Sequence, residues 1–455
     1  MQKLSIKNFG PISELNINIS NIMIFIGPQA SGKSTVSKSI YLFKSLKDDL
    51  VKHVIEAVEK EDIKFSSQKA TTEFKKMIRT KFVSFWGTTK HLTQFKIQYF
   101  YGGNKDIILQ LKDGYVQAFF SRRFHDELNS ICEDTLTFIT KQKNINKSFA
   151  SASEIFTIDS EKKNFYKKIE ELSNRLFEDN RLSLYIPAGR SVLSTLSEPL
   201  QQLVLTRISG HIKDSNSSGN IDPYLLDYSL KAFIERISNS KSTFNQDFET
   251  IIKDKGKFTN EPIDNDNLKA AIIIFDKILK GRYRFDRDGE KIFLANSEEF
   301  VKLSFASSGQ QEVIWILLQI FALILNRTKT YLIIEEPEAH LFPVAQKDIV
   351  ELFCLFSNLS NNQLLITTHS PYILSSLNNF LYAGKLGKEQ PIEVGKIINK
   401  KSWIKPEEVS AFYIENGILT DIIDRELMLI KAEEIDRASS LINEQFNNLF
   451  ELDVL

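Results

Sequence analysis

The sequence has little cysteine: two residues, Cys132 and Cys354, in a chain of 455. They stand far apart and lack the spacing of metal ligands, which argues against a disulfide scaffold and against a zinc site. Cysteine usage of this kind suits a reducing compartment, so we expect the protein in the cytoplasm. Residues 1–6 have none of the features of a signal peptide.

An excess of charge, long apolar runs and repeats are also missing. Lysine plus arginine and aspartate plus glutamate each number 58, so the net charge of zero implies no whole-surface attraction to nucleic acid, although a local basic patch would still permit contact with DNA. The longest apolar stretch, Val313–Leu325, is interrupted by Gln319 and is too short to cross a bilayer, so we expect no membrane contact. Without a sustained heptad pattern, a long coiled-coil arm is not expected.

A stretch near the N-terminus has the form G-x-x-x-x-G-K-[ST] of a phosphate-binding loop. Its candidate nucleotide-binding residues are Gly27, Pro28, Gln29, Ala30, Ser31, Gly32, Lys33, Ser34 and Thr35. The two glycines let successive backbone N–H groups curl around a triphosphate. Lys33 would place its charge on the β- and γ-phosphates, and the hydroxyl of Ser34 would ligate Mg²⁺.

The flanking residues predict the structural context that this loop needs. Asn21–Ile26 is an apolar run typical of a buried strand, and Lys33–Leu46 carries apolar residues at helical spacing. A phosphate bound by the loop would therefore lie at the N-terminus of a helix, where free backbone N–H groups favour an anion.

A second nucleotide-site motif follows far along the chain. Tyr331–Ile334 is an apolar run that leads into two carboxylates, Glu335 and Glu336. A buried parallel strand with acids at its C-terminal end has the form of the second motif of P-loop ATPases. Glu335 would hold Mg²⁺ or its water, although aspartate is usual at this position. Glu336 would polarise the attacking water as general base.

Two further motifs flank the acid pair. Ser307-Ser308-Gly309-Gln310-Gln311 precedes a helical stretch, and Thr367-Thr368-His369-Ser370-Pro371 follows the apolar strand Leu364–Ile366. The order of all these motifs resembles that of ATP-binding-cassette (ABC) ATPases. Within that class, residues 333–343 and 364–374 are similar to the group of RecF-like and overcoming-lysogenization-defect (OLD) ATPases, often called AAA15 or AAA21.

This resemblance covers residues 1–46 and about 280–385 well, and it implies a homodimer or higher oligomer with two ATP molecules between two heads. Ser307, Ser308, Gly309 and Gln310 match the signature positions that contact the ATP of the partner, with Ser308 where transporters usually have glycine. Glu338–Leu341 matches a loop that crosses the dimer interface, and His369 matches the histidine that senses the γ-phosphate. The implied catalytic residues are Glu336, His369 and Lys33, and the implied cofactors are ATP and Mg²⁺.

The coarse pattern, together with the resemblance, predicts an α/β fold. We expect a P-loop NTPase with an ABC-type ATPase head, which has a mixed sheet, helices on both faces and an antiparallel side sheet, plus a helical insertion. The expected parts are 1–120 and 281–385 for the head, 121–280 for a mostly helical insertion that serves dimerisation or partner binding, and 386–455 for a C-terminal helical extension. Leu184–Ile186 is predicted to be a short strand and Lys213–Asp222 a loop.

Some polar positions lie outside these motifs. The paired acids around residues 264–266 and 286–288 are predicted to serve turns rather than a metal ion. Arg190 follows the short strand Leu184–Ile186 at a sharp turn. Because strand ends in parallel sheets face the ligand crevice, Arg190 would approach the phosphates or the neighbouring head, and a surface salt bridge is the alternative.

Four kinds of ATPase carry such motifs. A transporter subunit does not need the long stretch between Thr35 and Ser307. A RecF-like or SMC-like clamp fits the head but would have coiled-coil arms. An OLD nuclease carries a C-terminal Toprim domain, whose Asp-x-Asp pair is missing after His369. Stand-alone ATPases of bacterial antiphage defence, such as Septu, PARIS and retron-associated ATPases, resemble this chain best.

We therefore expect an ATP-hydrolysing ABC-type ATPase without a nuclease domain, which senses or regulates a separately encoded effector, itself expected to be a nuclease. A RecF-like or SMC-like DNA repair or maintenance ATPase is the alternative.

The apolar stripes within residues 160–178 and 418–449 must be buried away from water by other parts of the protein or by a partner. They comprise Phe165, Ile169, Leu172 and Leu176 in the first, and Ile418, Ile422, Leu429, Ile435, Leu441 and Leu449 in the second. We expect part of this surface to pack on the head and the rest to contact a second copy and the effector.

Overall fold

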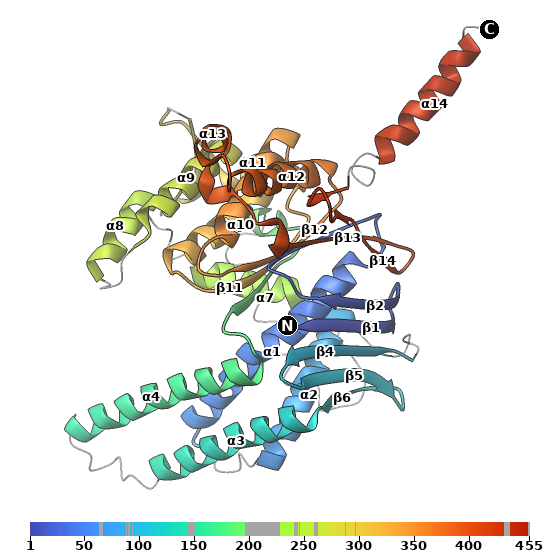
Figure 1. Ribbon diagram of the computed structural model, residues 1–455. Helices are drawn as coiled ribbons and strands as arrows, with labels where there is room; N and C mark the ends of the chain where they lie inside the picture. The colour runs from blue at the N-terminus through green and yellow to red at the C-terminus, as the bar shows by residue number, and fades with distance from the viewer. Residues whose placement is uncertain are drawn as a thin grey trace.

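The computed structural model describes most of the chain (Figure 1). The residues outside the description are 63–66, 88, 90–91, 93, 144–151, 196–227, 241–243, 245, 259–262, 287, 296, 432–436 and 454–455. The predicted loop Lys213–Asp222 lies outside the described residues, so that prediction is not addressed by the structure.

A six-stranded mixed sheet forms the centre of the fold, in the order β14-β13-β3-β12-β11-β7. Its strands are β3 (Ile22–Ile26), β7 (Leu182–Ile186), β11 (Thr330–Glu335), β12 (Gln363–Thr368), β13 (Val409–Glu415) and β14 (Ile418–Asp421). All neighbours pair in parallel except β13 and β14. Every residue of β3, β11 and β12 is buried, which is the environment that favours their continuous apolar runs.

Two hydrophobic cores lie on opposite faces of this sheet. Side chains alternate along a strand, so Ile22, Ile24 and Ile26 of β3 join one core while Met23 and Phe25 join the other. The first core includes α9 (Asn265–Leu279), α10 (Ser308–Leu325), α11 (Pro343–Ser357) and α12 (Pro371–Leu386). The second includes α1 (Lys33–Glu59), α2 (Ser67–Trp86), α3 (Arg122–Lys143) and α4 (Ala152–Leu176). Figure 1 shows these two layers on either side of the sheet.

An antiparallel sheet accompanies α1 in the second core. It has the order β2-β1-β4-β5-β6 and comprises β1 (Lys3–Phe9), β2 (Ile12–Asn18), β4 (Lys96–Gly102), β5 (Lys105–Lys112) and β6 (Tyr115–Phe120). The alternation of apolar and polar residues in these segments predicts such strands, and the structure confirms them. The α/β class, the mixed sheet with helices on both faces and the antiparallel side sheet are thus all confirmed.

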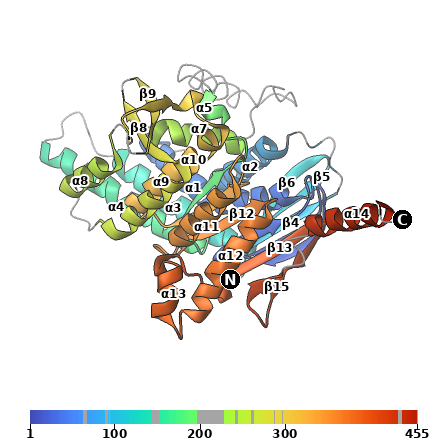
Figure 2. The same ribbon diagram turned by 90° about the horizontal axis from the view of Figure 1, so that it is seen from above.

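Smaller elements complete the described chain, and Figure 2 shows them from above. They are the three-stranded sheet β8 (Gly281–Asp286), β9 (Gly289–Leu294) and β10 (Phe300–Lys302), the pair β15 (Ile423–Asp424) and β16 (Leu429–Ile430), the helices α5 (Val192–Thr195), α7 (Tyr228–Ser240), α8 (Phe248–Phe258), α13 (Pro391–Ile397) and α14 (Arg437–Asp453), and the 3₁₀ turns η4 (Leu303–Phe305), η5 (Lys400–Ser402) and η6 (Pro406–Glu408).

The prediction of a helical extension over residues 386–455 is wrong for the middle of that range, which forms strands. Residues 409–415 form β13, which pairs in parallel with β3 inside the central sheet. The stretch from Ile418 to Leu429 contributes strands as well. The apolar residues there recur at spacings that fit a helix loosely, but Val409, Ala411 and Ile414 are buried beside β3. Tertiary pairing with a buried strand overrides such a weak local pattern. The proposed domain boundaries stay a prediction.

Helix α10 is long and apolar enough to cross a membrane by length and composition, and 83% of it is buried inside the protein. It is longer than the apolar stretch Val313–Leu325, because five residues of the Ser-Ser-Gly-Gln-Gln motif and its neighbourhood extend it to Ser308. Trp315 at its centre is fully buried, and its indole N–H donates to Ser194 Oγ at 3.0 Å. Among the described helices α10 alone meets this test, and its burial is that of a core helix.

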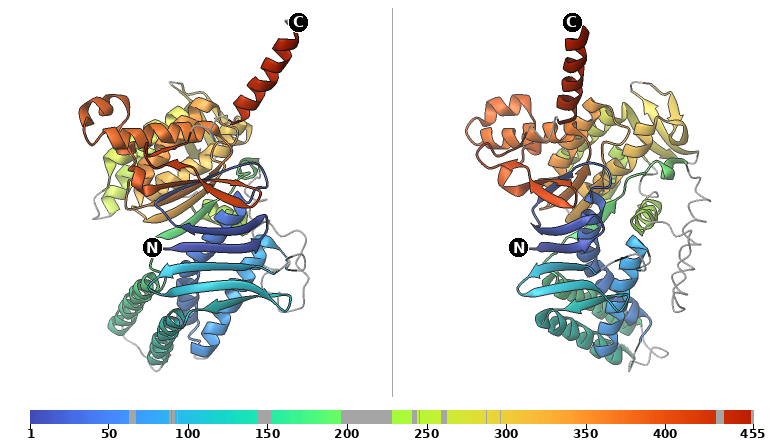
Figure 3. Two further views of the ribbon diagram at one scale, coloured as in Figure 1. Left: turned by 45° about the vertical axis from the view of Figure 1, so that its right-hand side comes forward. Right: turned by 90° about the vertical axis from the view of Figure 1, so that its right-hand side faces the viewer.

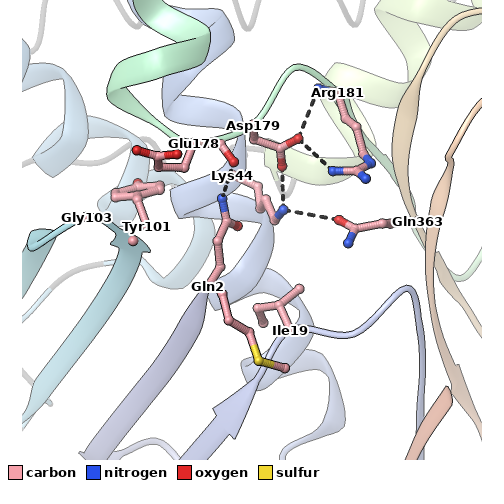
Figure 4. Close-up of a pocket in the computed structure, with 11 residues that line it drawn as sticks. Gln2, Ile19, Lys44, Tyr101, Gly103, Glu178, Asp179, Arg181 and Gln363 are labelled. Carbon is pink, nitrogen blue, oxygen red and sulfur yellow. Dashed lines mark hydrogen bonds and ion pairs between the residues drawn. The ribbon is translucent and has the colours of Figure 1, made fainter. Parts of the chain in front are cut away.

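A cavity of about 300 Å³ lies at the amino-terminal ends of β7 and β12, away from the strand ends that carry the acid pair (Figure 4). Lys44 of α1 pairs there with Asp179, and these side chains are 3% and 7% exposed. Arg181 Nη1 lies 3.1 Å from the other carboxylate oxygen of Asp179, and Lys44 Nζ lies 3.4 Å from Gln363 Oε1. These buried charges tie α1 to the edge of the central sheet.

Replacing Asp179 by alanine should lower the free energy of unfolding by about 3–5 kcal/mol, because the charge of Lys44 would stay buried without its partner. The double variant Lys44→Met, Asp179→Leu should recover part of that loss. Urea unfolding followed by circular dichroism measures both. The control is Glu14→Ala, which breaks the exposed pair with Lys7 and should cost no more than about 1 kcal/mol. A loss in the double variant equal to the sum of the losses in Lys44→Met alone and Asp179→Leu alone would contradict this account.

Candidate functional site

Three neighbouring parallel strands end at one edge of the central sheet and bring the motifs together. β3 leads into the phosphate loop at Gly27, β11 ends at Glu335, and β12 ends at Thr368. The register pairs Glu335 with Thr367 and Thr368 with Ile26, so the three strand ends lie level. Residues far apart in the sequence therefore meet around the phosphate loop.

The phosphate loop is held by close packing at its two glycines. A Cβ at Gly27 would lie 2.1 Å from the carbonyl oxygen of Ile414 in β13, and a Cβ at Gly32, where φ is +111°, would lie 2.6 Å from the side chain of Ile12. Only glycine fits both places. Helix α1 then begins at Lys33, so the loop presents a helix N-terminus as the sequence predicts.

Lys33 lies folded over the loop. Its Nζ donates to the carbonyl oxygens of Gly27 at 2.9 Å and Pro28 at 2.7 Å. Burial lowers the pKa of Lys33, and the charges of Glu336, Glu338 and Glu335 act in the opposite direction. One lysine facing three carboxylates is an arrangement that a triphosphate with its metal ion would complete, because the phosphates can take over the role of the two carbonyl acceptors.

Glu336 and His369, the candidate base and the candidate γ-phosphate sensor, are in direct contact. His369 Nε2 lies 3.2 Å from Glu336 Oε1. This hydrogen bond lowers the pKa of Glu336, with further help from the charges of Lys33 and Arg190 and against the effect of partial burial. Because its pKa is lowered, the carboxylate is ionised. Because it is 40% exposed, a water molecule can reach it. Both are properties that a general base needs.

Glu338 has a contact that sequence reasoning missed. One of its carboxylate oxygens, Oε1, accepts hydrogen bonds of 2.7 Å from the hydroxyl of Thr368 and from the backbone N–H of His369. The resemblance places Glu338 in a loop that crosses the dimer interface, whereas the structure engages it within its own chain, where it fixes the end of β12. The signal in the sequence is that Glu338 is the next acid after the pair Glu335-Glu336.

The chemistry of the site suits Mg²⁺. Glu335 Oε1 is buried and has no hydrogen-bond partner, while Glu335 Oε2 lies 3.4 Å from the backbone N–H of Ala188. An ionised oxygen in that position fits a metal ligand. Ser34 is exposed at the start of α1 and supplies a hydroxyl. Carboxylate and hydroxyl oxygens are hard ligands that Mg²⁺ accepts alongside substrate phosphates, whose charge the ion would neutralise. Glu335 and Ser34 would hold it here.

The signature residues contact other elements than the phosphate loop. Ser307 caps α10: its hydroxyl accepts from the backbone N–H of Gln310, whose side chain accepts from the backbone N–H of Ser307 in return. The amide of Gln310 also donates to the carbonyl oxygen of Leu279 at 2.7 Å. With the Gln310 side chain used in its own chain, the exposed start of α10 at Ser307 and Ser308 is what remains to meet a ligand.

Gly309 lets the loop after the acid pair approach α10. A Cβ on Gly309 would lie 2.6 Å from the carbonyl oxygen of His340. His340 has a left-handed backbone with φ of +60° and an exposed side chain. The signature motif and the loop Glu338–Leu341 therefore form one surface.

The remaining candidates have different outcomes. Asp264 caps α9 by accepting from the backbone N–H of Asn267 at 3.2 Å. Asp286 accepts from the backbone N–H of Asp288 at 2.9 Å, and both acids pair with Lys291, at 2.9 and 3.1 Å. The prediction of turn chemistry is therefore confirmed for Asp286, whereas Asp264 caps a helix. Among the described residues no group of three or more His, Cys, Asp or Glu side chains could hold a metal ion by itself. Arg190 is fully buried, so the surface salt bridge is excluded.

The chain belongs to the AAA ATPase domain family, whose profile matches residues 1–374. This membership supports ATP binding and ATPase activity, and the phosphate loop and the carboxylates beside it suit both. No curated protein matches the chain.

Similar solved structures include heads of SMC proteins. The SMC head bound to the C-winged helix domain of ScpA has a TM-score of 0.41 and 12% identity, and covers 92% of this chain and 96% of its own. The SMC head domain from Thermotoga maritima has a TM-score of 0.35 and 11% identity, covering 92% and 97%. The SMC head with an extended coiled coil, bound to the C-terminal domain of ScpA derived from Pyrococcus furiosus, has a TM-score of 0.36 and 14% identity, covering 97% and 100%. Likeness at this level carries no argument about function.

Lys33→Ala should weaken ATP binding on the order of 100-fold, because it removes a charged donor to the phosphates worth about 2–3 kcal/mol. Titration of the purified variant with a fluorescent ATP analogue measures the affinity. Lys52→Ala is the matched control, since Lys52 is an exposed lysine of the same helix. An affinity equal to that of the parent would show that the loop does not bind phosphate.

His369→Ala should reduce the rate of ATP hydrolysis and move the acid limb of its pH profile to higher pH. The hydrogen bond from His369 lowers the pKa of Glu336, so losing it raises that pKa, and the base becomes protonated at a higher pH than in the parent. The pH dependence of kcat/KM measures the shift. His125 of α3, whose side chain is 43% exposed, provides the control variant His125→Ala. An unmoved acid limb would mean that the group titrating there is not Glu336.

Proposed function

We propose that this chain is an ABC-type ATPase that binds and hydrolyses ATP, dimerises around two ATP molecules, and regulates a separately encoded effector, a nuclease, in bacterial antiphage defence. The catalytic part of the proposal rests on one observation: the ionised carboxylate of Glu336 lies against His369 beside the phosphate loop. In the proposed reaction Lys33 binds the β- and γ-phosphates, and Glu336 takes a proton from the attacking water.

Dimerisation is supported by apolar side chains exposed around the site. Phe305 precedes the signature motif and is 80% exposed; Phe342 and Val344 follow the loop Glu338–Leu341 and are 75% and 60% exposed; Tyr372 follows His369 and is 52% exposed. Large apolar side chains gathered beside polar functional motifs mark an interaction surface. A second head would cover them and bring its own signature residues to the γ-phosphate.

The effector contact is proposed for the C-terminal helix α14, which projects away from the rest of the described chain in every view (Figures 1 to 3). Its apolar side chains are exposed: Leu441, Ile442, Phe446, Leu449, Phe450 and Leu452, each between 56% and 70%. They occupy one broad side of the helix, and Asn443, Glu444, Asn447 and Glu451 occupy the other. An unpaired amphipathic helix of this kind favours a protein partner that offers an apolar groove.

The predicted apolar stripes therefore divide between two uses. Phe165, Ile169 and Leu176 of α4 are buried in the second core, and Ile422 is buried in the first. Ile418 and Leu449 are exposed, at 61% and 66%, whereas Ile435 lies outside the described residues. The buried residues of the two stripes pack on the head of the same chain. The exposed residues are available for the proposed contacts with a second copy and with the effector.

Glu336→Gln should keep ATP affinity, stop turnover and accumulate an ATP-bound dimer, because an amide cannot accept the proton of the attacking water. Light scattering on a sizing column with and without ATP measures the dimer. Phe342→Asp in the same background should abolish it, and Phe156→Asp, which changes an exposed phenylalanine of α4, should not. Normal hydrolysis by Glu336→Gln would show that another group is the base.

The effector half is tested by purifying the chain with the product of the neighbouring gene, with and without residues 437–453. We expect a complex that needs α14 and a nuclease activity that resides in the partner. A chain that stays monomeric under ATP, binds no neighbour and yet cuts DNA unaided would refute the proposal. Binding of DNA by the ATP dimer without any protein partner would favour the alternative, a RecF-like or SMC-like repair or maintenance ATPase.

A further inference from the structure

The guanidinium of Arg190 connects three parts of the site. It is fully buried, and its Nε forms an ion pair of 3.3 Å with the carboxylate of Glu312 in α10. Nη1 donates to the carbonyl oxygens of Pro187 and Glu335, both at 2.7 Å, and Nη2 donates to the carbonyl oxygen of Glu336 at 3.0 Å. One side chain therefore joins three elements: the turn after β7, helix α10, which follows Ser307 and is called the signature helix below, and the end of β11, which carries the acid pair.

Both carboxylate oxygens of Glu312 accept hydrogen bonds from backbone N–H groups. Its side chain is 3% exposed. One oxygen accepts from the backbone N–H of Arg190 at 3.1 Å and the other from that of Ser191 at 3.0 Å. A buried charge pair is stable only when its hydrogen-bonding groups are satisfied in this way. Glu312 lies in the second turn of α10, a few residues after the exposed signature residues Ser307 and Ser308, so any movement of the helix start would reach Arg190 through it.

The backbone that Arg190 holds is in an uncommon conformation. Glu336 has φ of +43°, in the left-handed region that side chains other than glycine rarely adopt. Its N–H donates to the carbonyl oxygen of Thr367 at 2.9 Å, and its carbonyl oxygen accepts from Arg190 and from the backbone N–H of Ala339 at 3.1 Å. Such a residue keeps its conformation only where the surroundings determine it on both sides. Here β12 holds the N–H, while Arg190 and the turn to Ala339 hold the carbonyl oxygen.

We propose that Arg190 is a positioning residue for ATP hydrolysis, which sets the carboxylate of Glu336 in place according to the position of the signature helix. It does so through the Glu312 pair on one side and the Glu336 carbonyl on the other, and touches neither phosphate nor water itself. This proposal rests on the proposed role of Glu336 as the base. When the partner's ATP binds the signature residues of one head, the position of α10 would therefore set the position of Glu336, the general base, in that same head.

The test compares Arg190→Lys with Arg181→Lys. Arg190 is fully buried and the side chain of Arg181 is 14% exposed; both pair with a buried carboxylate, and they flank the two ends of β7. A lysine keeps the charge but cannot hold Glu312 and two strand-end carbonyls together. We expect Arg190→Lys to lower kcat on the order of 100-fold, the usual effect of a small misplacement of a reacting group, with ATP affinity within about threefold of the parent. Arg181→Lys should change the melting temperature without changing kcat.

Two further variants show whether Arg190 acts through these partners. Glu312→Gln should lower kcat as Arg190→Lys does, and the double variant should be no worse than either, since both break one connection. A multiplicative loss of kcat in this double variant would overturn the proposal.

The outcomes separate this proposal from the proposed function. A normal kcat in Arg190→Lys, with Glu336→Gln inactive, would overturn the role of Arg190 alone. A loss of ATP affinity and of melting temperature in Arg190→Lys that matches Arg181→Lys, without a specific loss of kcat, would also overturn it, because that is what a purely structural residue does. Full turnover in Glu336→Gln would overturn the base assignment and, with it, this proposal.

Discussion

The site depends on the burial of three adjacent parallel strands on both faces. β3, β12 and β11 consist of residues that are all buried, so each face of the sheet needs its own cover, and the chain supplies helices above and α1 with the antiparallel sheet below. In-register parallel pairing then places the carboxyl ends of the strands level. A ligand crevice at such an edge is the expected consequence of this topology.

The loops at this edge are ordered by the chain itself before any ligand arrives. Ala30, Glu336 and His340 are residues other than glycine with positive φ, at +58°, +43° and +60°. Each costs of order 1–3 kcal/mol and persists only where neighbours determine it. The Arg190–Glu312 pair holds the acid pair in this way, and the carboxylate of Glu338 holds His369 by accepting hydrogen bonds from Thr368 and from the backbone N–H of His369. A preorganised site of this kind loses little energy to rearrangement when the substrate binds.

The parts that could be predicted from sequence are those with strong local signals. The continuous apolar runs of β3 and β11 and the glycines of the phosphate loop each have one physical interpretation, and the structure has strands and a loop there. β13 could not be recognised, because its identity depends on pairing with β3, almost the whole chain away. In the sequence Arg190 is only a charge after a strand end. Its connections to Glu312 and Glu336 depend on tertiary contacts that no local pattern carries.

The surfaces left over after folding also distinguish between kinds of partner. Two of the places with exposed apolar side chains are Phe305 and Phe342 beside the ATP site, and α14. Apolar contacts gain their energy from the area removed from water, whereas contacts with DNA gain it from neutralised phosphates and need local positive charge. A chain with 58 basic and 58 acidic residues offers no overall excess of such charge. The proposed contacts with a second copy and with an effector protein would cover these exposed apolar side chains.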